Sequence, residues 1–193
     1  MADQPKLLIV GAGGFGRTVA ETVLRQGGYE LAGFLDDGLA AGDTVFGRPV
    51  LGPLDAIDQQ ALQAECAIVA IGDNQVRADM HARLVGRGLE VVTVIHPDAS
   101  VAPSASVGDG VVVMGGVVVG TEAQLGNGVI VNAGATVDHH AVVEEFGHVG
   151  AGSVLAGGAR VGERAWLRAG CVLGYRAEVE PGRILPPGTV LGE

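Results

Sequence analysis

The chain has 193 residues, 48% of them hydrophobic, and a formal net charge of -10 at pH 7. This length holds one sizeable domain or two small ones, and the apolar content excludes a disordered chain. An acidic chain lacks the basic face that neutralises phosphates, so no nucleic-acid partner is expected. No apolar run has the length of a membrane span, and the start MADQPKLLIV lacks the basic region of a signal peptide. We therefore expect a cytoplasmic protein with no membrane partner.

The first ninety or so residues alternate between strand-like and helix-like segments. LLIVGAGGFG predicts a buried strand that enters a glycine-rich turn, and RTVAETVLRQGG predicts the helix after it. Three more strands are expected in ELAGFLDD, CAIVAIGDN and LEVVTVI, with a helix over NQVRADMHARLVGRG between the last two. This alternation predicts a small Rossmann-like parallel sheet, an α/β domain over residues 1–94.

The glycine-rich turn matches a dinucleotide-binding pattern in its spacing. Gly11, Gly13 and Gly16 form G-x-G-x-x-G, and Asp36 lies where an acid that binds ribose would lie. A dinucleotide site needs two mononucleotide halves, however, and this domain is about one half long. The pattern leaves three interpretations open: NAD, another nucleotide-linked ligand, which we favour, and a structural turn without a ligand.

A period of six residues begins at Ile95 and continues to Leu191. All seventeen positions of this series are aliphatic, and a mostly small residue follows four places after each of the first fourteen. A six-residue step advances an α-helix by about 240°, which would spread the aliphatic residues over three faces, so a helix is excluded. Repeats of this length are typical of a parallel β-helix. We expect this all-β domain over residues 95–193, with a little over five coils.

Three of the five histidines fall in VDHHAVVEEFGH, residues 137–148. A zinc site would need three or four ligands at one point, and adjacent histidines on a strand face opposite sides. A metal is therefore not expected. Two interpretations remain: a histidine that acts as a general base near neutral pH, or polar residues exposed on a corner of the scaffold.

Basic residues are unevenly distributed along the repeat region. None occurs between Arg87 and Arg160, whereas five of the twelve lie in the last 34 positions. They are either the solvated edges of the scaffold or a site for phosphate groups.

The two halves together resemble a known family. A short domain with GAGGFG, FLDD and AIGDN, followed by hexads with VNAGATVDHHAVVEEFGHVGAG, resembles the sugar O- and N-acetyltransferases of the sialic acid and bacillosamine type. The family includes N-acetyltransferases that act on UDP- or GDP-linked amino sugars, and the resemblance covers nearly the whole chain. It implies a left-handed β-helix, a homotrimer, acetyl-CoA bound between neighbouring prisms, and an N-terminal domain that holds the nucleotide of the sugar.

The resemblance also implies roles for single residues. The N-x6-H pattern of the family falls on Asn132 and His139, which makes His139 the catalytic base. The later F-x-H falls on Phe146 and His148, at the thioester end of acetyl-CoA, and the A-G pair along the pantetheine falls on Ala156 and Gly157. The nucleotide sugar would meet Gly13, Gly14, Phe15, Asp36 and Asp37.

Two positions depart from the family pattern. The residue after the catalytic histidine is often Glu or Asp, whereas here it is His140, and Phe15 stands where many relatives have His. Because a histidine cannot supply a fixed negative charge, Asp138, Glu122 or Glu144 would have to do so, or the base works without one. We place Asp138 in the catalytic group with His139 and Asn132.

The expected reaction is acetyl-CoA-dependent N-acetylation of a nucleotide-linked 4-amino-4,6-dideoxy sugar. His139 would take a proton from the amine as it attacks the thioester, in a direct transfer. A covalent route through Cys171 is disfavoured because the hexads place this thiol in the interior, and Cys66 is also expected to be buried and reduced. Two alternatives remain, namely O-acetylation of sialic acid or another polysaccharide sugar, and a non-catalytic trimeric scaffold.

Overall fold

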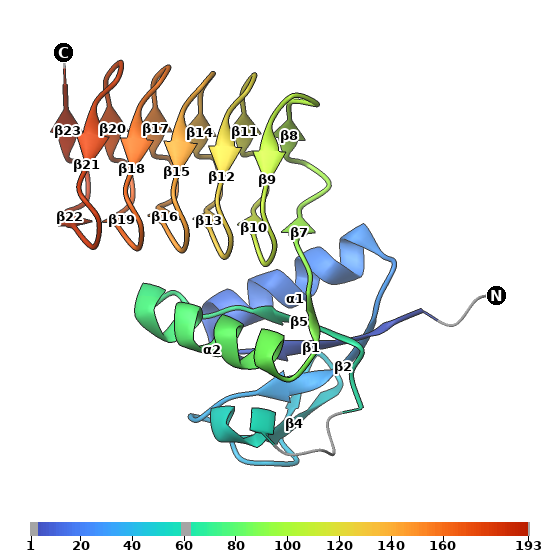
Figure 1. Ribbon diagram of the computed structural model, residues 1–193. Helices are drawn as coiled ribbons and strands as arrows, with labels where there is room; N and C mark the ends of the chain where they lie inside the picture. The colour runs from blue at the N-terminus through green and yellow to red at the C-terminus, as the bar shows by residue number, and fades with distance from the viewer. Residues whose placement is uncertain (1–3, 59–62, 193) are drawn as a thin grey trace. The chain divides into compact units, whose positions relative to one another are not determined.

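The computed structural model describes residues 4–58 and 63–192 of the chain. It divides into two compact units, and the boundary between them in the sequence lies between Val94 and Ile95. Figure 1 shows a unit with a small sheet and helices, and a second unit built only of short strands.

The first unit is a six-stranded sheet with two helices and one 3-10 helix. The strand order is β3-β4-β2-β1-β5-β6, and every neighbouring pair is parallel except β3 and β4. The elements are β1 (Lys6–Val10), α1 (Gly14–Gln26), β2 (Glu30–Leu35), β3 (Thr44–Val45), β4 (Arg48–Gly52), η1 (Leu54–Asp58), β5 (Cys66–Val69), α2 (Asn74–Gly86) and β6 (Glu90–Val91).

The predicted parallel sheet is therefore correct for its central strands and wrong at one edge. Strands β3 and β4 form an antiparallel hairpin, so the sheet is mixed. Phe46 and Gly47 form the turn with φ values of 49° and 70°, and a two-residue hairpin turn of this type needs positive φ at both positions. The predicted fourth strand, LEVVTVI, is also divided between β6 and β7 (Val94–Ile95).

Both helices form where the sequence predicts them, although α1 begins at Gly14, three residues before the predicted Arg17, and α2 ends at Gly86, two residues before the predicted Gly88. Helix α1 buries Val19, Ala20 and Val23 on one face and stops at Gly27, whose φ of 73° is left-handed. Helix α2 begins after Asp73, whose carboxylate accepts a hydrogen bond from the N–H of Val76.

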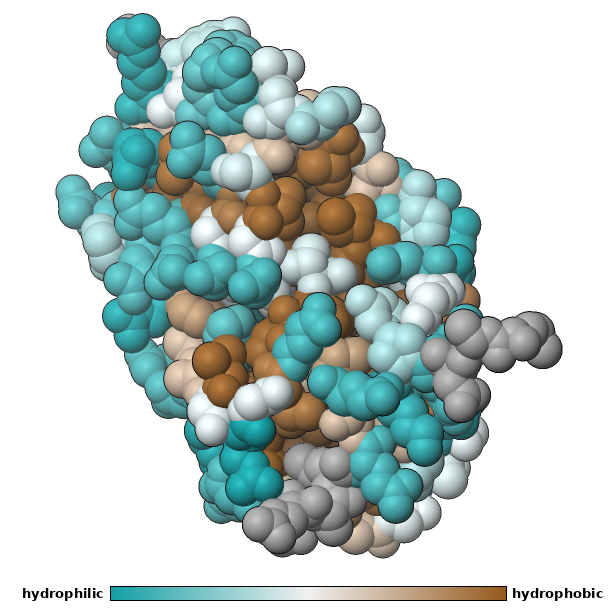
Figure 2. Space-filling view, turned by 45° about the vertical axis from the view of Figure 1, so that its right-hand side comes forward, coloured by the Kyte–Doolittle hydropathy of each residue, from teal (hydrophilic) through white to brown (hydrophobic). Residues whose placement is uncertain are grey.

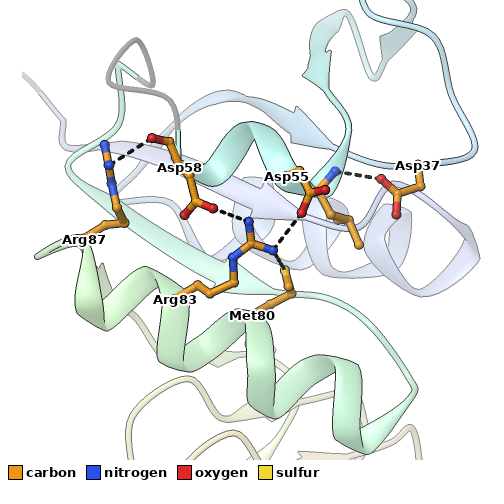
Figure 3. Close-up of polar contacts among 7 residues, drawn as sticks. Asp37, Asp55, Asp58, Met80, Arg83 and Arg87 are labelled. Carbon is orange, nitrogen blue, oxygen red and sulfur yellow. Dashed lines mark hydrogen bonds and ion pairs between the residues drawn. The ribbon is translucent and has the colours of Figure 1, made fainter.

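A cluster of charged side chains joins α2 to η1, as Figure 3 shows. The Arg83 guanidinium lies 3.0 Å from Oδ1 of Asp55 and 2.6 Å from Oδ2 of Asp58. Arg87 donates to the backbone carbonyl of Asp58 at 2.9 Å. Because the carboxylates are exposed, these contacts mainly orient the two helices and contribute little to stability.

The second unit consists of three parallel sheets, which we name sheet I, sheet II and sheet III. The chain visits them in turn, so equivalent residues in neighbouring coils are 18 positions apart, as in the pairing of Val118 with Thr136. Sheet I contains β7, β10 (Val112–Val113), β13 (Ile130–Val131), β16 (His148–Val149), β19 (Trp166–Leu167) and β22 (Ile184–Leu185). Sheet II contains β8 (Ser100–Val101), β11 (Val118–Val119), β14 (Thr136–Val137), β17 (Val154–Leu155), β20 (Val172–Leu173) and β23 (Val190–Leu191). Sheet III contains β9 (Ser106–Val107), β12 (Gln124–Leu125), β15 (Val142–Val143), β18 (Arg160–Val161) and β21 (Glu178–Val179).

This arrangement is the predicted left-handed parallel β-helix. Each strand turns its second residue into the prism, and the small residue two positions earlier points the same way. Val137 and Ala135 show the pattern, since both side chains are fully buried. The small residue thus belongs to the strand that follows it, and the tight corners between strands explain why a small side chain is needed there.

None of the helices in the described part of the chain has the length and apolar content needed to cross a bilayer.

Candidate active site

His139 lies on the corner between sheets II and III, which we name the II–III corner. In successive coils this corner is formed by Thr121 and Glu122, His139 and His140, Gly157 and Gly158, and Tyr175 and Arg176. Backbone hydrogen bonds connect the coils: His140 donates to the carbonyl of Thr121 at 2.9 Å, and Gly158 donates to that of His139 at 3.0 Å. The corner therefore places residues that are 18 positions apart directly above one another.

The second residue of each of these turns has a left-handed backbone. Glu122, His140 and Arg176 have φ values of 56°, 58° and 56°, a conformation that glycine adopts more easily. At the equivalent turn of the intervening coil, Gly158 has a φ of 71°. Each non-glycine residue holds this conformation at a cost of about 1 kcal/mol or more, and Phe146 and Arg164 do so with a φ of 56° at the corner between sheets III and I, so the conformation belongs to the repeat turn.

The His139 ring is connected to an acid through a second histidine. Nδ1 of His139 lies 3.0 Å from Nδ1 of His140, and the two rings meet edge to face at 87°. Nε2 of His140 lies 2.8 Å from Oε2 of Glu122. Of the three acids considered as partners of the histidine, Glu122 is thus the one in line with the two rings.

The other two acids have different contacts. Oδ1 of Asp138 accepts a hydrogen bond from the backbone N–H of His139 at 2.6 Å. Glu144 binds the guanidinium of Arg160 at 2.7 Å and accepts from the N–H of Glu163 at 3.1 Å. Asp138 therefore holds the backbone that carries the histidine, and Glu144 follows strand β15 of sheet III and pairs with Arg160.

Gly157 forms the floor beneath the His139 ring. A Cβ atom at position 157 would collide with the imidazole. Ala156 precedes it on the same corner, and its N–H donates to the carbonyl of Leu173 at 2.9 Å. The structure thus brings together His139, Asp138, Ala156 and Gly157.

Asn132 and His148 lie elsewhere on the prism. Asn132 follows β13, at the corner between sheets I and II, and its Oδ1 accepts from the N–H of Ala133 at 2.8 Å. His148 is the first residue of β16 in sheet I and is only 6% exposed. Within one chain, the predicted site is therefore divided between two corners and a sheet face.

His148 takes part in an aromatic stack that the sequence did not predict. Its ring lies parallel to that of Trp166, with centroids 4.8 Å apart and an angle of 10°. The guanidinium carbon of Arg168 lies 3.5 Å from the centroid of the Trp166 ring, in a cation–π contact. The signal in the sequence was the 18-residue spacing between His148 and Trp166, which pairs them in sheet I.

The glycine-rich turn of the first unit contains glycines of two kinds. A Cβ on Gly16 would overlap the carbonyl oxygen of Gly11, and one on Gly11 would lie 2.7 Å from the carbonyl oxygen of Ala70. Gly13 and Gly14 have nothing within 4 Å of that position. The fold thus requires Gly11 and Gly16, whereas Gly13 and Gly14 leave open surface beside the half-buried Phe15.

The two aspartates after β2 hold loops in place. Asp36 accepts from the N–H of Ala12 at 2.7 Å through Oδ2, and from that of Gly38 at 2.8 Å through Oδ1. Asp37 accepts from the N–H of Leu54 at 2.8 Å, at the start of η1 (Figure 3). Asp36 therefore fixes the glycine-rich turn itself.

No group of three or more metal-ligating side chains is found in residues 4–58 and 63–192.

Both cysteines are buried free thiols. Burial, with the nearby charges of Glu90 and Glu65, raises the pKa of Cys66 to about 11. Sγ of Cys171 lies 3.3 Å from the carbonyl oxygen of Pro186, inside the prism. Neither thiol is presented to a substrate.

A groove of about 370 Å³ lies along sheet III, with Glu144, Glu145 and Glu163 in its lining. Its negative charge does not suit phosphates. Two of the arginines in the last 34 positions form ion pairs with these glutamates. Arg160 pairs with Glu144, and Arg164 lies 2.6 Å from Glu163. For these two, the geometry favours the solvated-edge interpretation.

Each of the two units matches the model of a known protein family. Residues 6–84 match the family model described as the PglD N-terminal domain, and residues 90–193 match the GMPPB C-terminal domain. The chain is 32% identical to the UDP-N-acetylbacillosamine N-acetyltransferase of Bacillus subtilis (strain 168) over 109 residues. That alignment covers 55% of this chain and 50% of the relative, so the chain matches about half the length of this curated protein.

Two solved structures match over nearly their whole length. The acetyltransferase domain of PglB from Neisseria gonorrhoeae FA1090, in complex with acetyl coenzyme A, is 35% identical with a TM-score of 0.78, and the match covers 98% of this chain and 97% of that one. A variant of perosamine N-acetyltransferase from Caulobacter crescentus, with one histidine replaced by asparagine and in complex with CoA and GDP-perosamine, is 33% identical. Its TM-score is 0.79, and the match covers 96% of this chain and 90% of that one. The chain therefore belongs to the sugar acetyltransferase family of the UDP-N-acetylbacillosamine and perosamine N-acetyltransferase type, whose β-helix is built of hexapeptide repeats.

Proposed function

We propose that the chain transfers an acetyl group from acetyl-CoA to the amine of a nucleotide-linked 4-amino-4,6-dideoxy sugar. The observation that carries this proposal is an exposed imidazole, His139, which is positioned through Nδ1 by His140 and lies over Gly157. The other nitrogen, Nε2, lies on the edge of the ring next to Gly157, and we place the substrate amine there. The relatives support the acceptor class, since one is named for UDP-N-acetylbacillosamine and another was crystallised with CoA and GDP-perosamine.

His139 acts as the general base in this reaction. As the sugar nitrogen attacks the thioester carbon, Nε2 of His139 takes the proton that the amine loses. The carbon–sulfur bond then breaks and coenzyme A departs, so no acetyl-enzyme forms. The buried positions of Cys66 and Cys171 favour this direct transfer.

The remaining site residues have binding roles. Ala156 and Gly157 line the path of the pantetheine, with His148 at the acetyl-CoA thioester end. In the N-terminal domain, residues 1–94, the open surface at Gly13 and Gly14 receives the nucleotide sugar beside Phe15. Asp36 and Asp37 support this surface, and Asp36 does so by holding Ala12.

The active enzyme is a homotrimer. Asn132 and His148 do not lie on the corner of His139, so a site with all three requires more than one subunit. The outward positions of sheet II support such packing, because Val118, Val154, Val172 and Val190 are 38–66% exposed and follow one another, with Thr136, along the sheet. Figure 2 shows apolar residues open to solvent on one face of the molecule.

The experiment that tests the function measures thiol release from acetyl-CoA with UDP-, GDP- and dTDP-linked 4-amino sugars, and with free sialic acid. The proposal predicts turnover with one nucleotide amino sugar, and a product that carries an amide. Turnover with sialic acid alone would assign the chain to the O-acetyltransferases. If calorimetry detects no binding of acetyl-CoA, the result would favour the non-catalytic scaffold over both acetyltransferase functions.

A further inference from the structure

We propose that His140 and Glu122 are positioning residues that hold His139 in one tautomer. This inference rests on the proposed function of His139 as the base. It replaces the direct acid partner expected from the family pattern with a two-step chain, from the imidazole of His139 through that of His140 to the carboxylate of Glu122.

The order of donors and acceptors follows from the distances. A carboxylate only accepts hydrogen bonds, so at 2.8 Å from Oε2 of Glu122, Nε2 of His140 carries the proton. A neutral His140 is then unprotonated at Nδ1 and accepts there. At 3.0 Å, Nδ1 of His139 must donate to it, which leaves Nε2 of His139 unprotonated. That nitrogen is the one free to take a proton from a substrate amine.

The backbone fixes the positions of both supporting residues, Glu122 and His140. Glu122 and His140 occupy the same left-handed position in adjacent coils, with φ values of 56° and 58°. The N–H of Glu122 donates to Oγ of Ser104 at 3.2 Å, and the N–H of His140 donates to the carbonyl of Thr121 at 2.9 Å. Since the side chains at these positions stack from coil to coil, the corner directs the carboxylate toward the imidazole.

The hydrogen-bond chain from His139 to Glu122 needs no proton transfer beyond His139. When Nε2 of His139 takes the amine proton, its Nδ1–H remains bonded to His140, and the charge of Glu122 stabilises the imidazolium through the neutral ring between them. Because Glu122 and His140 are both 61% exposed in their side chains, we expect a modest gain, on the order of tenfold in kcat for each link.

The first test is the tautomer of His139 in the ligand-free protein, read from ¹⁵N shifts of the imidazoles by NMR at a pH where both rings are neutral. Native protein should show His139 with its proton on Nδ1. Glu122→Gln keeps an acceptor and should keep this tautomer, whereas Glu122→Ala should give a mixture. Glu180→Ala, at an exposed glutamate of another corner, is the control and should change nothing. An unchanged tautomer in Glu122→Ala would overturn the chain whatever the protein acetylates.

The second test is kinetic, with Glu122→Ala, His140→Ala and the double variant. If Glu122 acts through His140, the double variant should lose no more kcat than His140→Ala alone, with KM for acetyl-CoA unchanged in all three. His140→Glu, which places an acid next to the base, should recover most of the rate and make it insensitive to Glu122→Ala. Multiplied losses, or no recovery with glutamate, would contradict the positioning role. A native enzyme with no acetyltransferase activity would refute the proposed function. The tautomer measured by NMR would then decide whether the hydrogen-bond chain exists.

Discussion

The imidazole of His139 occupies the space that a Cβ atom on Gly157 would need. Residues 18 positions apart share a corner in adjacent coils, so this contact is a direct result of the repeat length. One spacing of 18 residues thus places both the proposed base, His139, and the glycine beneath its ring. A methyl group at position 157 is the smallest change that would displace the imidazole from this glycine.

Gly157→Ala should lower kcat by on the order of a hundredfold, because the His139 ring must leave its position over the glycine. The backbone tolerates the change, since Ala133, Ala151 and Ala169 occupy the same place in the turns of the I–II corner. Thermal unfolding should therefore remain close to that of the native protein. Ala151→Gly is the matched control and should leave the rate unaltered; an active Gly157→Ala enzyme would show that the ring is not held there.

Gly13→Ala and Gly14→Ala should fold normally and bind the nucleotide sugar about tenfold more weakly. Each Cβ would enter open surface in the protein and would collide only with a ligand. Gly86→Ala, with equally open surroundings at the end of α2, should bind normally. Calorimetric titration measures the affinity. Gly16→Ala should fail to fold correctly, because its Cβ would overlap Gly11. Unchanged affinity in both Gly13→Ala and Gly14→Ala would remove the turn from the binding site.

Val154→Glu or Val172→Glu should dissociate the trimer. Both side chains are 38% exposed on sheet II, and a buried carboxylate at an apolar interface costs several kcal/mol. Gln124→Glu, on the outward face of sheet III, is the control. Sedimentation velocity should give trimers for the native protein and the control, and monomers for the valine variants. A monomeric native protein, or trimers in every variant, would contradict the assignment of this face.

The cysteines should be unreactive in the native state. The pKa of Cys66 is raised from 9.0 to about 11, so at pH 8 about one thiol in a thousand is ionised. Cys171 is fully buried inside the prism, so an aromatic disulfide reagent should label neither cysteine until the protein is unfolded in guanidinium. Because the unfolded thiol ionises first, this group favours the folded state below pH 9, and its contribution is lost as pH rises toward 11. Rapid labelling at pH 8 would contradict the burial of both thiols.

The repeat region was predicted well from sequence because its period is strict. An aliphatic residue every six positions excludes other folds, and Val137 and Ala135 lie in the interior as expected. The hairpin of β3 and β4 was missed because its strands are short and its turn contains Phe46, a residue that seldom adopts positive φ. Gly47 was the only local signal for it.

The candidate site was predicted in part. The spacing of 18 residues links Glu122 to His140 and His139 to Gly157, and counting three hexads per coil would have found both pairs. The sequence could not show that the second histidine stands between His139 and the acid, since that depends on side-chain directions at a corner. The same count shows that Asn132 and His139, seven residues apart, lie on different corners.

The central claim is that His139 is the base for acetyl transfer, and the most direct measurement compares the single-turnover rate of the native enzyme with that of His139→Asn. Acetyl-CoA and the accepted nucleotide amino sugar should both be saturating, with their affinities measured separately. We predict unchanged affinities and a rate lower by on the order of a hundredfold or more. A variant that retains the native rate with both substrates bound would show that another group takes the proton.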